Sequence, residues 1–207
     1  MKKQLARNKK LIIGLTGSFG SGKSMAARFF MSHGAEIIDA DKIARSLLTP
    51  GSPCYKKIVA IFGGSIVGSR RRIDRKKLAG LVFTDSRSLN RLNSIIHPEV
   101  VRSVKKTAKK SCRKVIVIDA PLLIEAGLVP WVDKVIVVTI SRKEQLKRII
   151  GRSGLKKEDI ENRIKAQMPL SRKVRLADFI IDNNGTVART KEQVERIWKT
   201  IISTPRR

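Results

Sequence analysis

Residues 17–24 read Gly17-Ser18-Phe19-Gly20-Ser21-Gly22-Lys23-Ser24, and this stretch decides the fold. It matches the pattern G-x-x-x-x-G-K-[ST] of a phosphate-binding loop. Its glycines let successive backbone N–H groups point at one spot, where the start of a helix adds positive potential. Lys23 then places an ammonium on the β- and γ-phosphates, and Ser24 offers a hydroxyl to Mg²⁺. The loop predicts binding of ATP or GTP and leaves open what happens to the phosphate.

The sequence around the loop predicts alternating strands and helices. The apolar residues 11–15 predict a buried strand, and a helix is expected from inside the loop to about His33. Further strands are expected at residues 35–39, 115–118, 135–138 and 179–181. The runs that begin at 115 and 135 are β-branched and continuously apolar, as in strands covered on both faces. This alternation indicates an α/β fold, the three-layer α/β/α sandwich of P-loop NTPases with a parallel sheet.

Two segments do not show this alternation of strands and helices, and each predicts an additional structural unit. Residues 41–111 look helical without a strong strand signal, which indicates an inserted helical domain that covers the substrate. Residues 152–175 are very basic and helical, which indicates a lid. The nucleotide-binding core is then expected to comprise residues 11–40, 112–151 and 176–204, after a basic extension at residues 1–10.

Two local signals predict helix boundaries in this layout. His97-Pro98 should interrupt a helix, because proline has no N–H and cannot continue the hydrogen-bond ladder. Thr190 and Gln193 form the capping box expected to open a final helix that runs to Ile202.

Aspartates at strand ends are candidates for the chemistry. Asp39 and Asp41 follow the second strand, and Asp119 closes the third. Strand ends on this side of an open α/β sheet face the ligand crevice. Asp39 or Asp41 can orient and deprotonate an attacking hydroxyl or hold Mg²⁺ through water, although Asp41 is also placed to cap the next helix. Asp119 has the position of a Walker-B aspartate that binds Mg²⁺ directly or through water, and a simple turn residue is an equal alternative.

Two arginines open the basic segment. Arg148 and Arg152 lie one helical turn apart. Guanidinium forks match phosphate oxygens and neutralise charge while a phosphoryl group transfers. In so basic a chain most arginines are solvated surface residues, so the spacing favours a role for at least one of the two.

Composition limits the classes of protein. The chain has 207 residues, 42% of them hydrophobic, which suits one α/β domain with inserted helices. No apolar run approaches the roughly 20 residues that a membrane-spanning helix needs, and no signal peptide is recognisable. Cys54 and Cys112 lie far apart without a CxxC partner, as expected of free thiols in a reducing compartment. We therefore expect a cytoplasmic protein without a membrane partner, with a monomer favoured.

The charge is strongly positive. Lys and Arg number 45 against 17 Asp and Glu, a formal net charge of +28. Such a field attracts polyanions, so nucleic acid, anionic membrane surfaces and phosphorylated metabolites all fit. Aromatic residues make up only 4% of the chain, which leaves little material for base stacking. We expect incidental polyanion binding rather than a dedicated nucleic-acid function.

The ordered motifs resemble the dephospho-coenzyme A kinase family from residue 11 to about residue 202. The matching stretches are Gly14-Leu15-Thr16-Gly17, Ile38-Asp39-Ala40-Asp41 with Ile43-Ala44-Arg45, Ile96-His97-Pro98, Pro121-Leu122-Leu123 with Glu125, Gln145-Leu146-Lys147-Arg148, Arg163-Ile164 with Ala166-Gln167-Met168, and Ala177-Asp178 with Ile181-Asp182-Asn183. The phosphate-binding loop alone is shared by many NTPases, but this ordered set is highly specific.

The resemblance implies a kinase that phosphorylates the ribose 3′-hydroxyl of dephospho-coenzyme A with ATP and Mg²⁺, the last step of coenzyme A synthesis. It implies that Asp41 is the base and that Lys23 and Arg148 stabilise the transferring phosphoryl group. The implied ATP contacts are Gly17, Ser18, Phe19, Gly20, Ser21, Gly22, Lys23, Ser24, Met25, Arg148 and Arg152. The implied acceptor contacts are Asp39, Asp41, His97, Pro98, Pro121, Leu122, Leu123 and Glu125. Mg²⁺ would be held by Ser24, with Asp39 or Asp119 through water.

The sequence also departs from the family pattern. Ser18-Phe19 stands where Gly-Ile is common, Met25 where Thr is common, and Ser153 replaces the acid that often follows Arg152. Two other functions stay open. One is a nucleoside or nucleotide kinase on the same scaffold, and the other is a basic nucleic-acid-binding protein with a vestigial ATP site. The intact Lys23, Ser24 and Asp41 argue against the second.

Overall fold

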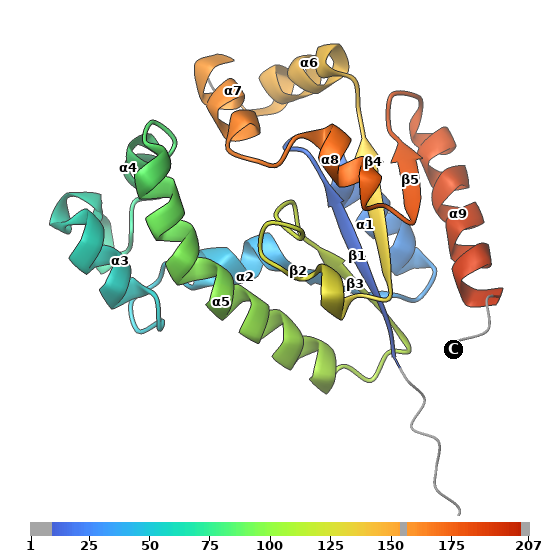
Figure 1. The fold of residues 1–207 in the computed structure, drawn as a ribbon, viewed down its shortest axis with the longest axis horizontal. Coiled ribbons are helices and arrows are strands. Elements are labelled where there is room, and N and C mark those ends of the chain that lie inside the picture. The colour runs from blue at the N-terminus through green and yellow to red at the C-terminus, as the bar shows by residue number, and fades with distance from the viewer. Residues whose placement is uncertain (1–9, 154–156, 204–207) are drawn as a thin grey trace, which may run out of the picture.

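The computed structural model describes residues 10–153 and 157–203, except the side chains of Arg152, Ser153 and Lys157 (Figure 1). Residues 1–9 of the expected basic extension and residues 154–156 of the expected lid therefore lie outside the described residues. No helix of the described part is long and apolar enough to cross a bilayer.

The core is one five-stranded parallel sheet in the order β2-β3-β1-β4-β5. The strands are β1 (Leu11–Gly17), β2 (Glu36–Asp39), β3 (Val115–Asp119), β4 (Lys134–Thr139) and β5 (Phe179–Asp182). Every strand expected from the sequence is present, and the predicted parallel α/β fold is confirmed. The register sets Leu15 beside Asp119 and Asp39 on the other side of Asp119, so residues from three strands meet at one end of the sheet.

The helices cover both faces of the sheet (Figure 1). They are α1 (Lys23–Ser32), α2 (Ala40–Ser46), α3 (Tyr55–Phe62), α4 (Arg75–Val82), α5 (Ser86–Lys110), α6 (Arg142–Ser153), α7 (Lys157–Lys165), α8 (Leu170–Arg175) and α9 (Val187–Ser203), with short 3₁₀ turns at Gly64–Ile66, Ser69–Arg71 and Val129–Trp131. Helices α2 to α5 occupy the interval between β2 and β3, and α7 and α8 lie between α6 and β5.

Strands β1 to β4 contribute side chains to two cores, which explains their apolar runs, whereas β5 packs on one side only and leaves Ile180 exposed. In β3, Val115 and Val117 pack with α1 and α9, whereas Ile116 and Ile118 face the core beneath α5. Successive strand residues point to opposite faces, so a strand buried on both sides has no position left for a polar residue.

The predicted break at His97-Pro98 is wrong, because α5 runs without interruption through Pro98. Pro98 is exposed, while Leu92, Val100 and Val104 on the opposite face are buried in the core. An interior proline costs a helix about 3 kcal/mol. Burial of one large aliphatic side chain contributes about 1.5–3 kcal/mol, so packing on both sides of the proline outweighs that cost.

The predicted start of the last helix is also wrong, because α9 begins at Val187 rather than after Thr190. The residue that caps it is Thr186, whose Oγ1 accepts a hydrogen bond from Arg189 N (3.2 Å). Thr190 is buried inside the helix. Gln193 instead joins α9 to β5, since its side chain accepts from the N–H of Asp182 (2.9 Å) and donates to the Asp182 carbonyl (2.8 Å).

Candidate active site

The phosphate-binding loop joins β1 to α1 and has a backbone that only its glycines tolerate. Gly20 and Gly22 have φ values of 76° and 85°, in the left-handed region that L-residues rarely adopt. A Cβ on Gly22 would lie 2.0 Å from Asn183 Nδ2, and a Cβ on Gly17 would lie 2.6 Å from the Val138 carbonyl oxygen. The glycines therefore permit both the tight turn of the loop and its close packing against Val138 and Asn183.

Three buried or half-buried amide side chains brace the loop from outside. Asn183 donates to the Ser21 carbonyl (2.7 Å) and accepts from Thr190 Oγ1 (2.9 Å). Gln145 Nε2 donates to Ser18 Oγ (3.1 Å), and Gln167 Oε1 accepts from the Phe19 N–H (2.8 Å). Sequence reasoning gave these amides no role, because neutral side chains far along the chain carry no local signal of where they bind. They fix the loop before any ligand arrives.

A cavity of about 520 Å³ opens over the loop, within the size range of small-molecule sites. Its walls are residues 18–25 together with Arg28, Asp41, Pro121, Arg148, Ile149, Asn183, Gly185 and Val187. Of the expected ATP contacts among the described side chains, only Gly17 is not part of this wall. Gly17 is buried at the end of β1, and the Arg152 side chain lies outside the described residues.

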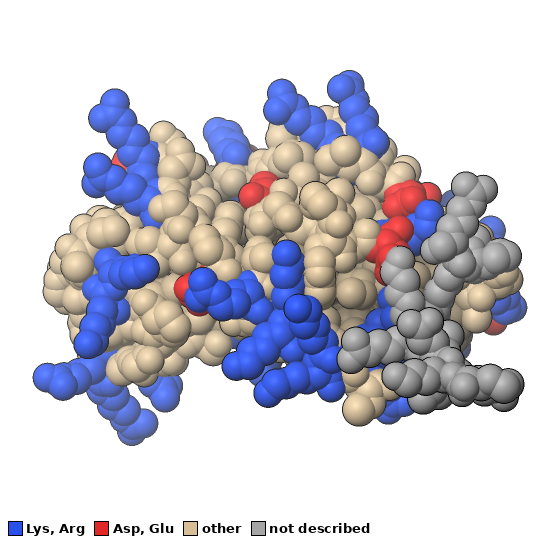
Figure 2. Space-filling model, turned by 60° about the horizontal axis from the view of Figure 1, so that its bottom comes forward, with Lys and Arg blue, Asp and Glu red and all other residues tan. Residues whose placement is uncertain are grey.

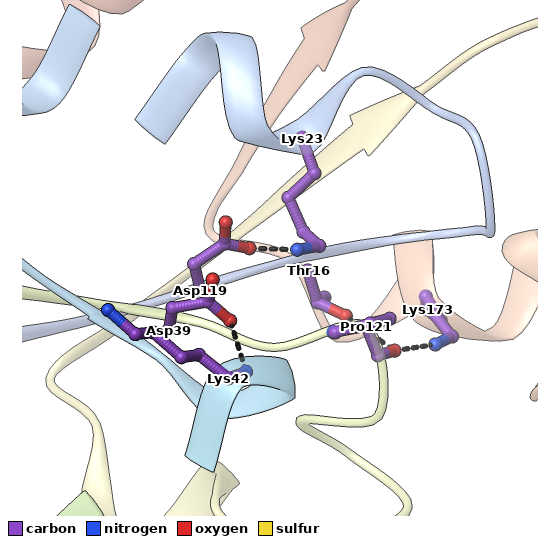
Figure 3. A network of polar contacts seen from close by, with 7 residues as sticks. All are labelled: Thr16, Lys23, Asp39, Lys42, Asp119, Pro121 and Lys173. Carbon is purple, nitrogen blue, oxygen red and sulfur yellow. Dashed lines mark hydrogen bonds and ion pairs between the residues drawn. The ribbon is translucent and has the colours of Figure 1, made fainter. Parts of the chain in front are cut away.

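Lys23 forms an ion pair with Asp119 at the base of the cavity (Figure 3). Both side chains are nearly buried, with exposed fractions of 11% and 8%. Burial lowers the pKa of Lys23 to about 8, and the carboxylates of Asp41 and Asp39 act in the opposite direction. The direct contact with Asp119 also favours the charged ammonium. The two roles considered for Asp119 from the sequence were Mg²⁺ ligand and turn residue, and neither included this ion pair with Lys23.

Asp39 and Asp41 have different tasks in the structure. Asp39 caps α2, since its Oδ1 accepts from the Lys42 N–H (2.8 Å), so the alternative in which Asp41 caps this helix is wrong (Figure 3). Asp41 lies in the first turn of α2 and lines the same cavity as Lys23. Its carboxylate contacts solvent but is surrounded by protein. The resulting partial loss of hydration raises its pKa, against the opposing effect of Lys23.

Two arginines face the same cavity. Arg148 is half-buried, and its Nη1 lies 3.9 Å from where a Cβ of Gly22 would be. Arg28, on α1, lines the cavity as well and was missed, because one arginine among so many carries no distinguishing pattern. Together with Lys23 they surround the loop with positive charge suited to phosphate oxygens.

The expected acceptor residues that follow β3 pack against β1 and α8. Leu123 is buried against Gly14, and Pro121 accepts hydrogen bonds at its carbonyl from Thr16 Oγ1 (3.1 Å) and from Lys173 Nζ (Figure 3). Pro121 and Asp41 reach the cavity over the phosphate loop. The structure does not place the other expected acceptor residues in its wall, namely Asp39, His97, Pro98, Leu122, Leu123 and Glu125.

His97 and Glu125 leave polar atoms without partners. Burial lowers the pKa of His97, with Glu125 opposing, so the imidazole is neutral near pH 7. Among the described residues, His97 Nε2 and Glu125 Oε2 are buried and make no hydrogen bond. Buried polar atoms almost always have a protein or water partner, so these two positions can receive polar groups.

The sequence did not indicate the buried position of Lys173. It lies in the basic segment that was expected to be a lid, yet its side chain is fully buried. Its Nζ contacts Glu125 Oε1 (2.9 Å), which also accepts from the Met168 N–H (2.9 Å). The pair therefore attaches α8 to the chain that follows β3. Because this segment contains several lysines, its sequence does not indicate which of them is buried.

Lys173→Met is expected to lower the free energy of unfolding by about 3 kcal/mol, because it leaves the Glu125 carboxylate buried without its cation. The partial exposure of Glu125 places this value at the low end of the usual range. Urea unfolding measures it. Lys165→Met, which alters an exposed lysine of the same segment, should change stability little. The double variant Lys173→Met/Glu125→Gln should recover most of the loss, and a Lys173→Met protein as stable as Lys165→Met would contradict the prediction.

Helix α7 contacts both the phosphate-binding loop and the inserted helices. The Arg163 guanidinium lies 5.6 Å from the Phe19 ring of the phosphate loop and 5.5 Å from the Phe83 ring that follows α4. Such cation–π contacts stabilise by about 0.5–1 kcal/mol each at exposed sites. Phe19 stands where the family commonly has another residue. Its contact with Arg163 is therefore not expected from the family pattern.

The parallel sheet, the braced phosphate loop and a lysine that shares a cavity with an aspartate define a P-loop kinase. A family model described as dephospho-CoA kinase matches residues 11–189. The chain belongs to the dephospho-CoA kinase family.

Individual comparisons agree with this family. The chain is 46% identical over 194 residues to a dephospho-CoA kinase of Carboxydothermus hydrogenoformans, covering 91% of this chain and 94% of the relative. It is 39% identical to the dephospho-CoA kinase of Aquifex aeolicus, covering 93% and 98%. Among solved structures, TT1252 of Thermus thermophilus superposes with a TM-score of 0.80 at 29% identity, covering 95% of this chain and 100% of that one. The dephospho-CoA kinase of Campylobacter jejuni has a TM-score of 0.66 at 28% identity, covering 92% and 96%.

Proposed function

We propose that this chain transfers the γ-phosphate of ATP to the ribose 3′-hydroxyl of dephospho-coenzyme A. The observation that carries the proposal is the common cavity of Lys23, in the phosphate-binding loop, and Asp41, at the start of the inserted helices. One group binds the phosphoryl donor and the other meets the acceptor, so the two substrates come together between them. Family membership supplies the identity of the acceptor.

The phosphates are bound by the loop. Its N–H groups and the start of α1 receive the β- and γ-phosphates, and the Lys23 ammonium turns from Asp119 toward their oxygens. Arg148, at the cavity wall, neutralises charge as the phosphoryl group moves. Because the amides of Asn183, Gln145 and Gln167 hold the loop in place, little reorganisation is needed when the transition state forms.

Asp41 acts as the base. Its carboxylate accepts the proton of the 3′-hydroxyl while the hydroxyl oxygen bonds to the γ-phosphorus and the bond from that phosphorus to the ADP oxygen breaks. The raised pKa of Asp41 brings it closer to the operating pH, where a general base is more effective. Asp39, by capping α2, holds the first turn that carries Asp41.

The donor set of the site fits Mg²⁺ bound together with ATP. The Ser24 hydroxyl is exposed at the cavity, and the carboxylates of Asp39 and Asp119 lie at neighbouring strand ends. Within the described residues, no group of three His, Cys, Asp or Glu side chains could hold a metal ion without other ligands. Mg²⁺ prefers one or two protein ligands plus phosphates and water, and it would neutralise the phosphate charge here.

The remaining parts of the chain complete the proposal. Residues 41–111 form the acceptor-binding insertion, and His97 and Pro98 from it, together with Pro121, Leu122, Leu123 and Glu125, face the acceptor. Residues 152–175 form the lid, whose α8 end Lys173 attaches to the core. Support for the lid comes from Arg163, which contacts the phosphate loop and the insertion at once. A lid in this position excludes water and limits hydrolysis of ATP. Arg152, at its start, is proposed as an additional ATP contact.

A coupled ADP-release assay tests the proposal. Dephospho-coenzyme A, AMP, adenosine and pantothenate are offered separately with ATP and Mg²⁺. Dephospho-coenzyme A is expected to give ADP release far above the acceptor-free rate, with a product that carries one added phosphoryl group. Faster turnover with AMP or adenosine would establish a nucleotide or nucleoside kinase instead. ADP release that no acceptor stimulates would remove the kinase proposal.

A further inference from the structure

The carboxyl-terminal half of α5 and the adjoining amino ends of two strands carry a dense group of cations, which we name the α5 basic face. Its members are Lys10, Arg102, Lys105, Lys106, Lys109, Lys110, Arg113 and Lys114. Lys10 and Lys114 directly precede β1 and β3, which pair side by side. Figure 2 looks onto this end of the molecule and shows Lys and Arg side chains gathered there.

Few of these charges are neutralised within the described part of the protein. Arg102 forms the one ion pair of the set there, with Glu99 (2.6 Å). The carboxylates of Glu36, which accepts from the Ser111 hydroxyl, and Asp133, which accepts from the Ile12 N–H (2.8 Å), border the face, and with Glu99 they number three against its eight cations. Uncompensated like charges repel one another, so a bound polyanion would relieve this repulsion.

Contacts with neighbouring residues hold two lysines of the face in place, and the spacing along α5 suits an extended polyanion. Lys10 Nζ donates to the carbonyls of Ala108 (3.0 Å) and Lys109 (2.7 Å), near the end of α5. Lys105 lies 5.6 Å from the Trp131 ring centre. Along α5, the cations from Arg102 to Lys110 span about 12 Å at 1.5 Å per residue. That length matches three or four phosphates of one DNA strand, which are spaced about 3.4 Å apart along the duplex axis.

We propose that the α5 basic face binds the phosphate backbone of nucleic acid without reading its sequence. A membrane is the less suitable partner, because the apolar side of α5 is already used. Val100, Val104 and Ala108 are buried in the core, and none of the exposed large hydrophobic residues lies in residues 100–114. Interfacial helices bind bilayers by inserting an apolar face, which this helix lacks. The aromatic ring at the face, Trp131, is partly buried against the core and lies 5.6 Å from Lys105 Nζ, so the face offers little surface for base stacking.

Binding at this face leaves the kinase site open. The phosphate-binding loop follows the carboxyl end of β1, whereas Lys10 precedes its amino end. The seven residues of β1 separate the two ends by about 20 Å. The protein can therefore bind nucleic acid while its ATP cavity stays accessible, and the two activities can be separated by mutation.

The test compares two triple variants of the full chain with equal loss of charge. Lys106→Gln/Lys109→Gln/Lys110→Gln alters the α5 basic face, and Lys191→Gln/Arg196→Gln/Lys199→Gln alters exposed cations of α9. Fluorescence anisotropy with a 20-base-pair DNA duplex is measured from 50 to 200 mM KCl. For the unaltered chain, about five phosphate contacts predict a slope of log K against log salt near −4 to −5. The α5 variant should lose at least tenfold in affinity at 100 mM KCl and reduce the slope by about 2 to 3.

The α9 variant should bind the duplex nearly as tightly as the unaltered chain, and both variants should retain their ADP-release rates. Equal losses in the two variants would show that total charge, and not this face, determines binding, which overturns the proposal. No duplex binding by the unaltered chain at 100 mM KCl overturns it as well. So does an α5 variant that loses binding to vesicles of phosphatidylserine and phosphatidylcholine while its duplex binding is unchanged.

Discussion

Asp41→Asn is expected to lower kcat by about 10²–10⁴-fold while ATP binding is retained. The asparagine keeps the size of the side chain but cannot accept the proton of the acceptor hydroxyl at neutral pH. The phosphate loop, its amide braces and Lys23 are unchanged, so the ATP contacts stay in place. Removal of a negative charge from the cavity does not oppose the binding of an anionic nucleotide. Steady-state kinetics with dephospho-coenzyme A and calorimetric titration with ATP measure the two quantities.

The matched control is Asp85→Asn. Asp85 is an exposed aspartate that caps α5 in the same insertion, and asparagine caps a helix about as well. This variant should have ordinary turnover and ordinary stability. If Asp41→Asn instead kept the kcat of the unaltered enzyme, Asp41 would not be the base. An unchanged kcat with a raised KM for the acceptor would assign Asp41 to acceptor binding alone.

Lys23→Ala is expected to lower kcat/KM by about 10³-fold and to weaken ATP binding. The ammonium is the cation that the loop places on the β- and γ-phosphates, and loss of one preorganised donor at a transferring group costs about 10²–10³ in rate. The substitution also leaves Asp119 as a nearly buried carboxylate without its cation, which adds repulsion toward the phosphates. Turnover and ATP affinity are measured under the same conditions as for Asp41→Asn.

Because the lost ion pair also affects folding, a second variant separates stability from chemistry. Lys23→Arg keeps a cation beside Asp119 and should unfold in urea near the midpoint of the unaltered chain. Its planar guanidinium differs in shape from an ammonium, so activity should still be strongly reduced. Lys42→Ala, an exposed lysine on α2, serves as the control with ordinary kinetics. Unchanged kinetics in Lys23→Ala would contradict the assignment of the loop to ATP.

Much of the local structure followed from the sequence. The five strands were recognisable because each contains a short apolar run, and β1 to β4, which pack on both faces, need no distant partner to reveal that pattern. The phosphate-binding loop was recognisable for a related reason. Gly20 and Gly22 occur where the backbone has positive φ, so the requirement is written into the motif itself. The common cavity of Lys23 and Asp41 then follows from parallel strands whose carboxyl ends meet at one edge.

Errors arose where distant packing overrode a local preference. Pro98 is a local signal for a helix break, but α5 continues through it because residues on the other side of the helix are buried in the core. Thr190 with Gln193 fits a capping box, yet Thr186 caps the helix and both predicted residues contact other parts of the fold. Asp39 and Asp41 were both able to cap α2. Only the direction in which the chain leaves β2 selects Asp39 for this task.

The sequence by itself determined the nucleotide loop, the parallel sheet and the family, because these depend on residue types at fixed short spacings. Tertiary structure alone decided which charges are paired and which amides hold the loop. Lys23 meets Asp119 across 96 positions, and Asn183 meets Ser21 across 162. Lys173 became the buried lysine of a basic segment only because α8 packs over Glu125. Contacts between distant positions exist only once the chain has folded, so no local window of sequence contains them.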